Sequence, residues 1–334
     1  MARRLVTVFG GSGFIGRHLV QRLAADGWTV RVAVRDTEAA AFLQPLGNMG
    51  QIIAVPCRVN HRLSVELAVQ GADAVVNLVG ILFERGKASF QAIHVEGARI
   101  IAESAAKAGV TRLVQMSALG ADAASDSNYA RSKAQGEEAV RTAFPKATIL
   151  RPSVVFGPED DFFNRFAVML HTFGVLPVIT SDGFKMVRRG GGITFDLYGS
   201  GGPKFQPVYV GDVADAIMVA LHSENAVGKT YVLGGPEVMS LKQVHELVMK
   251  STERCALLAP LPFALAKIQA LFLQYWPKPM LTPDQVRLMK KDSVLTGKPG
   301  FDQLGIIPTA PEIIVPTYLR RHIPIEKQWH WPKG

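Results

Sequence analysis

A glycine-rich loop close to the start of the chain constrains the fold more than any other feature. Residues 4–9 form an apolar run typical of a strand, and residues 14–25 have the periodicity of a helix. Between them, glycines recur at every third position. Such a strand–turn–helix brings backbone amides and a helix N-terminus to an anion, which predicts a site for the pyrophosphate of a dinucleotide. An ordinary glycine turn is the alternative. The residues of this loop that are expected to bind the cofactor are Gly10, Ser12, Gly13, Phe14, Ile15, Gly16 and Arg17.

Strand and helix patterns alternate through the N-terminal half of the chain, which predicts an α/β fold with a doubly wound parallel sheet of the Rossmann type. We expect residues 1–160 to form an NAD(P)-binding domain, with 205–235 returning to it. Beyond Pro152, glycine and proline become frequent. Residues 161–204 and 236–334 are expected to form a smaller, mixed C-terminal region that meets a partner or a substrate.

The choice of cofactor depends on the end of the second predicted strand, 29–34. Enzymes that use NAD usually place a carboxylate there, whereas this chain has Arg35. A guanidinium binds a phosphate through two parallel hydrogen bonds, so Arg35, assisted by Arg17, favours NADP(H) over NAD(H). The alternative is a solvated Arg35 followed by Asp36 as a helix cap.

A Tyr-x-x-x-Lys motif at Tyr129 and Lys133 predicts acid–base chemistry. Four residues on a helix place both side chains on one face, where the Lys133 ammonium would lower the Tyr129 pKa and hold the nicotinamide ribose. Ser117 follows a predicted strand and is expected to donate a hydrogen bond to a substrate carbonyl. The alternative makes Tyr129 a half-buried helix residue and Lys133 a surface charge.

The ordered landmarks of the chain resemble extended short-chain dehydrogenases. They are the glycine loop, Asn77–Gly80, Ser117, Tyr129–Lys133, Leu150–Pro152 and Gln206–Ala214. The resemblance implies that Val79, Gly80 and Pro152 also bind the cofactor. Arg58 stands where many relatives have an acid that meets the adenine, so it either stacks on the adenine or is solvated. His94 stands where the family commonly has Asn, and we interpret it as a structural residue. Ser117 lies only twelve residues before Tyr129, whereas active members usually carry a longer loop there.

A narrower resemblance is to the accessory subunits of respiratory complex I known as NADH dehydrogenase (ubiquinone) 1 alpha subcomplex subunit nine. It implies a structural role, in which tightly held NADPH stabilises a subunit beside the quinone-binding junction without hydride transfer. An active NADPH-dependent reductase or epimerase and a redox-sensing binder stay open as alternatives. The segments that carry the resemblance are 76–82, 117–122, 143–148, 155–160, 204–210 and 233–237.

Charge and hydropathy suggest where the chain acts. The net charge of +9 favours anionic partners, but no nucleic-acid module is recognisable, and two separate cysteines predict neither a disulfide nor a metal site. The first strand begins almost at residue 1, and no apolar run is long enough to span a bilayer. We therefore expect a peripheral protein on the cytoplasmic face of a bacterial inner membrane, docked on complex I with possible membrane contact. The apolar stretch 262–276, or else ordinary core packing, and a tail with Trp329 and Trp331 would contribute. A deletion beyond Pro316 is expected to weaken docking alone.

Overall fold

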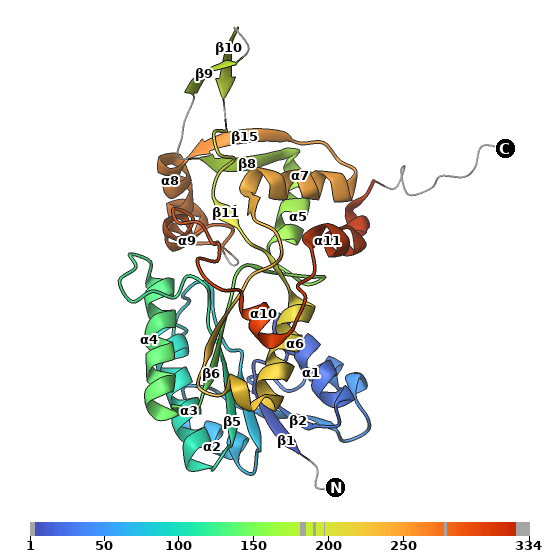
Figure 1. The fold of residues 1–334 in the computed structure, drawn as a ribbon, viewed down its shortest axis with the longest axis vertical. Coiled ribbons are helices and arrows are strands. Elements are labelled where there is room, and N and C mark those ends of the chain that lie inside the picture. The colour runs from blue at the N-terminus through green and yellow to red at the C-terminus, as the bar shows by residue number, and fades with distance from the viewer. Residues whose placement is uncertain (1–3, 181–184, 190–191, 197, 277–278, 325–334) are drawn as a thin grey trace, which may run out of the picture. The chain divides into compact units, whose positions relative to one another are not determined.

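The structure, a computed structural model, describes residues 4–180, 185–189, 192–196, 198–276 and 279–324 (Figure 1). It divides into two compact units. The first comprises Met1–Pro152, Val210–Leu233 and Leu295–Ile307, and the second comprises Ser153–Tyr209, Gly234–Val294 and Pro308–Gly334. Leu295–Ile307, which the sequence placed in the C-terminal region, thus joins the first unit. The tail residues Trp329 and Trp331 lie outside the described residues.

A seven-stranded sheet forms the centre of the first unit, in the order β13-β6-β5-β4-β1-β2-β3. Every pair in it is parallel, which confirms the predicted doubly wound Rossmann sheet. The strand order reverses direction between β1 and β4, so the loops that follow these two strands meet at the switch point. The strands are β1 (Leu5–Phe9), β2 (Thr29–Val34), β3 (Ile52–Pro56), β4 (Ala74–Asn77), β5 (Arg112–Met116), β6 (Thr148–Pro152) and β13 (Thr230–Leu233).

Helices cover the sheet, as the continuous apolar strands require. Helix α1 packs against α6, where an Arg22–Asp215 ion pair of 2.6 Å joins them, while α2, α3 and α4 pack in series (Figure 1). Buried Phe9, Ile101 and Leu113 belong to the core between sheet and helices. The helices are α1 (Phe14–Ala25), η1 (Ala41–Leu46), α2 (Arg62–Val69), η2 (Gln91–Gly97), α3 (Ala98–Lys107), α4 (Asn128–Ala143), α6 (Val210–His222), η3 (Glu224–Ala226) and α10 (Gly300–Leu304).

The helical segment from Gln91 to Lys107 is not uniform. Its first part, η2, is a π-helix, and α3 continues from it as a regular α-helix. A Cβ atom on Gly136 would lie 2.1 Å from the carbonyl oxygen of His94, so the backbone of α4 packs directly against this wide turn. A π-turn inside a helix is often found at a functional site, and this one carries His94.

The second unit is mixed, as predicted, and is built from short sheets and separate helices. Its core includes Phe156, Phe163, Leu176 and Leu319, and the buried Tyr318 hydroxyl donates a 2.6 Å hydrogen bond to Asp160. No helix in the described ranges has the length and apolar character needed to cross a bilayer. The elements are β7 (Val155–Phe156), α5 (Phe163–Phe173), β8 (Val175–Thr180), β9 (Lys185–Arg189), β10 (Gly192–Asp196), β11 (Lys204–Phe205), β12 (Val208–Tyr209), β14 (Met239–Ser240), α7 (Leu241–Thr252), β15 (Leu257–Pro262), α8 (Phe263–Leu273), α9 (Pro283–Leu288), α11 (Pro311–Leu319) and η4 (Arg320–His322).

Candidate functional site

The glycine loop between β1 and α1 has the geometry of an anion site. Gly10 adopts a φ of +77°, and its carbonyl accepts a 3.0 Å hydrogen bond from the Gly13 amide. A Cβ on Gly16 would lie 2.5 Å from the Gly10 oxygen, so only glycine allows helix and turn to pack this closely. Gly13 caps α1 and brings no side-chain acceptor to the first-turn amides. Those amides and the helix dipole therefore suit a bound phosphate.

The loop after β4 lies beside the glycine loop. A Cβ on Gly10 would lie 3.3 Å from the Val79 nitrogen, so the two backbones nearly touch. The Val79 amide donates to Asn77 Oδ1 at 3.1 Å, and Asn77 Nδ2 donates to Gln115 Oε1 at 2.8 Å. These bonds hold Val79 and Gly80, two predicted cofactor residues, at the switch point of the sheet. The residues present there fit a dinucleotide.

Three arginines are predicted to bind the cofactor. Arg17 lies in the first turns of α1, and Arg35 and Arg58 follow the neighbouring strands β2 and β3. Arg35 is exposed just beyond β2, and Arg58 is exposed just beyond β3. The Asp36 carboxylate accepts a 3.0 Å bond from the Ala39 amide, so it caps a turn. The Arg17 guanidinium lies 5.0 Å from the ring centroid of Phe42. Because β2 and β3 are parallel neighbours, Arg35 and Arg58 follow the same edge of the sheet.

Tyr129 and Lys133 lie on α4, with the Lys133 nitrogen 5.8 Å from the centroid of the Tyr129 ring. The interpretation of Lys133 as a surface charge is wrong, because its side chain is buried. Burial lowers the pKa of Lys133 to about 8, an effect that the Glu137 carboxylate opposes. Burial raises the pKa of Tyr129 to about 12. The lowering of the Tyr129 pKa by the Lys133 ammonium stays a prediction.

His94 connects the loop after β4 to α4. Its Nε2 atom accepts a 3.0 Å hydrogen bond from the Ile81 amide, which can only donate. The ring proton therefore lies on Nδ1, which is 2.9 Å from the Ser132 hydroxyl. Burial, together with the charge of Lys133, lowers the pKa of His94 to about 3, so the ring stays neutral. A structural role for His94, as the sequence suggested, agrees with these contacts.

A buried cluster lies one helical turn beyond Lys133 on α4, and the sequence did not predict it. The Ser117 hydroxyl donates to the buried Glu137 carboxylate, which also accepts bonds of 2.8 and 2.6 Å from Arg151. Ser117 is thus held by the protein's own carboxylate, and its contact with a substrate carbonyl stays a prediction. Glu137 stands four residues after Lys133 on α4. This spacing places both side chains on one face of the helix and could have predicted the cluster.

The remaining predicted residues complete the surroundings of Lys133. A Cβ on Gly80 would lie 3.2 Å from the Lys133 nitrogen and 3.7 Å from His94 Nε2, so the loop after β4 meets α4 at Gly80. Pro152 ends β6, and its carbonyl accepts a 2.9 Å bond from the Leu119 amide. The structure therefore gathers Val79, Gly80 and Lys133 around one point. Such an arrangement is suited to the nicotinamide half of a dinucleotide.

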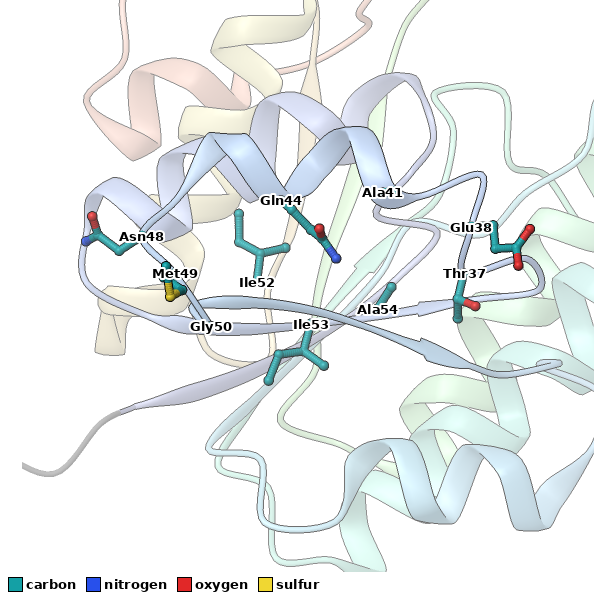
Figure 2. A pocket seen from close by; sticks show the side chains of 10 residues that line it. All are labelled: Thr37, Glu38, Ala41, Gln44, Asn48, Met49, Gly50, Ile52, Ile53 and Ala54. Carbon is teal, nitrogen blue, oxygen red and sulfur yellow. The ribbon is translucent and has the colours of Figure 1, made fainter.

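A separate hollow of about 800 Å³ lies at the outer edge of the sheet (Figure 2). It is bounded by η1 and by the edge strand β3. None of the predicted cofactor residues lines it, so it is distinct from the dinucleotide site. Its lining residues are Thr37, Glu38, Ala41, Gln44, Asn48, Met49, Gly50, Ile52, Ile53 and Ala54.

The parallel sheet, the glycine loop at its switch point and the Tyr129–Lys133 pair together define a dinucleotide-binding α/β protein. The chain belongs to the NAD dependent epimerase/dehydratase family, whose model matches residues 6–234. That match contains the glycine loop and the whole Tyr129–Lys133 site.

Known proteins similar to the chain divide into subunits and enzymes. Mitochondrial NADH dehydrogenase (ubiquinone) 1 alpha subcomplex subunit 9 from Rattus norvegicus is 36% identical over 321 residues, which cover 95% of this chain and 80% of that protein. A ceramide reductase from Caulobacter vibrioides is 36% identical over 179 residues, 54% of this chain and 55% of that protein. The structure of dTDP-glucose 4,6-dehydratase from Streptomyces venezuelae with NAD and TYD bound has a TM-score of 0.70 at 20% identity and covers 98% of this chain and 99% of that one. This last likeness is one of fold alone.

Proposed function

We propose that the chain is an accessory subunit of respiratory complex I, NADH:ubiquinone oxidoreductase, which holds NADP(H) without turnover. The observation that carries this proposal is the 36% identity to subunit 9 along 95% of the chain. A similarity confined to nucleotide binding would stop near residue 234, where the family model ends. The similarity to subunit 9 continues past that residue and extends through both units.

The chemistry of the site supports retention of the nucleotide over catalysis. A tyrosine whose pKa is raised to about 12 gives up its proton reluctantly near neutral pH. Ser117 is engaged by Glu137. In this proposal Lys133 binds the ribose and the glycine loop binds the pyrophosphate. When bound, the nucleotide would contribute its binding free energy to the folded subunit.

The proposal extends to cofactor preference and place. Arg35 and Arg17 favour NADP(H), because a guanidinium binds a 2′-phosphate and the position that would carry a ribose-binding carboxylate is occupied by Arg35. We place the subunit near the quinone-binding junction, peripherally on the cytoplasmic face of a bacterial inner membrane. The charge of +9 supports docking on an anionic surface.

Copurification tests the proposal. Membranes from the native host are solubilised in mild detergent, and complex I is separated by native electrophoresis and probed for the chain. We expect the chain to migrate with NADH-oxidising activity and to release NADP(H) when denatured. A chain that migrates only as a free protein, while complex I runs without it, would contradict the proposal.

A second candidate is an active NADPH-dependent reductase. The ceramide reductase relative favours it, as does the presence of both Tyr129 and Lys133. Tyr129→Phe removes a proton donor and little volume, so it separates the two roles. An accessory subunit should then support respiration almost normally, whereas Lys133→Ala should release nucleotide. If Tyr129→Phe abolishes function with NADPH bound and assembly normal, the chain is an enzyme.

A further inference from the structure

Helix α8 has an inverted distribution of side chains. Its small residues Ala266 and Ala270 are fully buried. Four of its large apolar residues are exposed: Leu265, Ile268, Leu271 and Phe272 are between 46% and 75% exposed. A helix at a water-exposed surface normally buries its large apolar side chains and leaves the small or polar ones outside. The outer face of α8 is therefore suited to contact with something other than water.

The exposed residues form a continuous stripe. Leu265, Ile268 and Phe272 are spaced by three and four residues, which places them on one side of the helix. Tyr275 and Trp276, directly after the helix, are 84% and 69% exposed. We call these residues, together with Leu271, the α8 face. An apolar stripe that ends in a tyrosine and a tryptophan matches the polarity gradient of a bilayer interface, where an aromatic ring lies between acyl chains and headgroups.

The sequence around α8 carries more positive than negative charge. Between Glu253 and Asp284 there is no Asp or Glu, and the charged residues are Arg254, Lys267 and Lys278. Lys267 lies on α8 itself and is exposed. A long lysine extends its charge toward phosphate headgroups while its methylenes stay with the apolar layer.

We propose that the α8 face docks directly on an anionic phospholipid surface, lying in the plane of the interface. Apolar side chains supply attraction that salt does not weaken, and the Lys267 ammonium supplies attraction that salt screens. This contact does not require complex I, so it goes beyond the proposed function. The helix is too short to cross the bilayer and would enter only the headgroup and upper acyl layers.

Flotation of the purified full-length chain with lipid vesicles tests this inference. The vesicles consist of phosphatidylcholine alone or of phosphatidylcholine mixed with phosphatidylglycerol. We expect the wild type to float with the anionic vesicles. The Ile268→Gln/Phe272→Gln variant should have an affinity for them that is lower by about tenfold or more. Lys267→Glu should reduce the preference for phosphatidylglycerol.

A matched control is available on α2. Leu63 and Leu67 are 60% and 61% exposed, comparable with the altered positions, but belong to the first unit. Leu63→Gln/Leu67→Gln makes the same chemical change and should leave vesicle binding as in the wild type. If this control loses binding to the same extent, exposed apolar area in general, and not the α8 face, would be responsible, and the proposal would fail.

Fluorescence gives a second readout that does not depend on a destabilised variant. In a chain with Trp329→Phe and Trp331→Phe, the remaining tryptophans are buried Trp28 and exposed Trp276. Anionic vesicles should shift the emission to the blue, because Trp276 leaves water. No shift and no flotation overturn the proposal. A chain that migrates with complex I but ignores vesicles would overturn the lipid contact and would leave the proposed function intact.

Discussion

Among single residues, burial governs the ionisation of the Tyr129–Lys133 pair and lowers the pKa of Lys133 to about 8. Tyr129 and Lys133 share a helix as predicted, yet the pKa of Tyr129 is raised to about 12 by burial. The buried Glu137 carboxylate connects Ser117 to Arg151 from a position that the motif does not include. Desolvation and long-range pairing both depend on what the rest of the chain places nearby.

Arg35 tests cofactor choice. Arg35→Asp replaces a phosphate-binding cation with a carboxylate that suits ribose hydroxyls and repels a 2′-phosphate. We expect NADPH affinity to fall by about tenfold or more and NADH affinity to change little or rise. Titration of the nucleotide-free chain measures both affinities. Equal losses for the two nucleotides would remove Arg35 from the specificity site, and Arg58→Asp gives a comparison at the neighbouring strand end.

His245 tests the cost of a buried polar ring. It is fully buried against Phe166, at a centroid distance of 4.6 Å, and neither ring nitrogen has a hydrogen-bond partner among the described residues. His245→Leu should therefore raise the free energy of unfolding by about 1–2 kcal/mol at neutral pH. Denaturant titration measures the change. A loss of stability would show that the ring has a partner or an essential shape, and the exposed His171→Leu is the control.

The same residue predicts a pH dependence. Burial lowers the pKa of His245 in the folded chain to about 4, whereas its pKa in the unfolded chain is about 6.5. The unfolded state therefore binds the extra proton between these values, and the wild type should lose stability as the pH falls from about 6.5 to about 4. In His245→Leu this decline should be less steep, although neutral His94 contributes in the same direction. Equal slopes in the two proteins would argue against a neutral buried ring.

Among the structural elements, the turn from β1 to α1 contains one glycine that we expect to be needed for folding, Gly16, and one that we expect to be needed for nucleotide binding, Gly13. A Cβ on Gly16 would lie 2.5 Å from backbone atoms, so Gly16→Ala should destabilise the fold by about 1–3 kcal/mol. A Cβ on Gly13 would have one close neighbour, the Gly10 oxygen at 3.2 Å. Gly13→Val should therefore fold but exclude the pyrophosphate.

Thermal melting with and without NADPH distinguishes these glycines. Ligand at about 100 times its dissociation constant adds about 2.7 kcal/mol to the stability of the wild type. The Gly13→Val chain should melt near the unliganded wild type and gain nothing from NADPH. If it gains as much as the wild type does, the glycine loop is not the nucleotide site.

At the scale of the whole molecule, attachment to membranes should resist salt. Exposed charges are screened within about 10 Å at 0.1 M salt, whereas buried apolar contact is not. High salt should leave much of the chain on native membranes, and a chaotrope should release it. Complete release by salt alone would mean that charge accounts for the attachment.

The core of the second unit determines where a C-terminal deletion can begin. A deletion beyond Pro316, expected from the sequence to affect docking alone, would remove Tyr318 and Leu319 from the core of the second unit. Truncation after residue 324 leaves this core complete. We expect this shorter deletion to keep NADPH binding and to weaken docking, as measured by fractionation.

The amino-acid sequence is enough to predict the alternation of strands and helices, the place of the glycine loop and the spacing of Tyr129 and Lys133. These are local properties, since propensity, periodicity and turn chemistry act over a few residues. Tertiary structure decided the partner of Ser117, the tautomer of His94, the return of Leu295–Ile307 to the first unit and the outward face of α8. Each of these depends on contacts between segments far apart in the chain, and on the solvent that those contacts exclude.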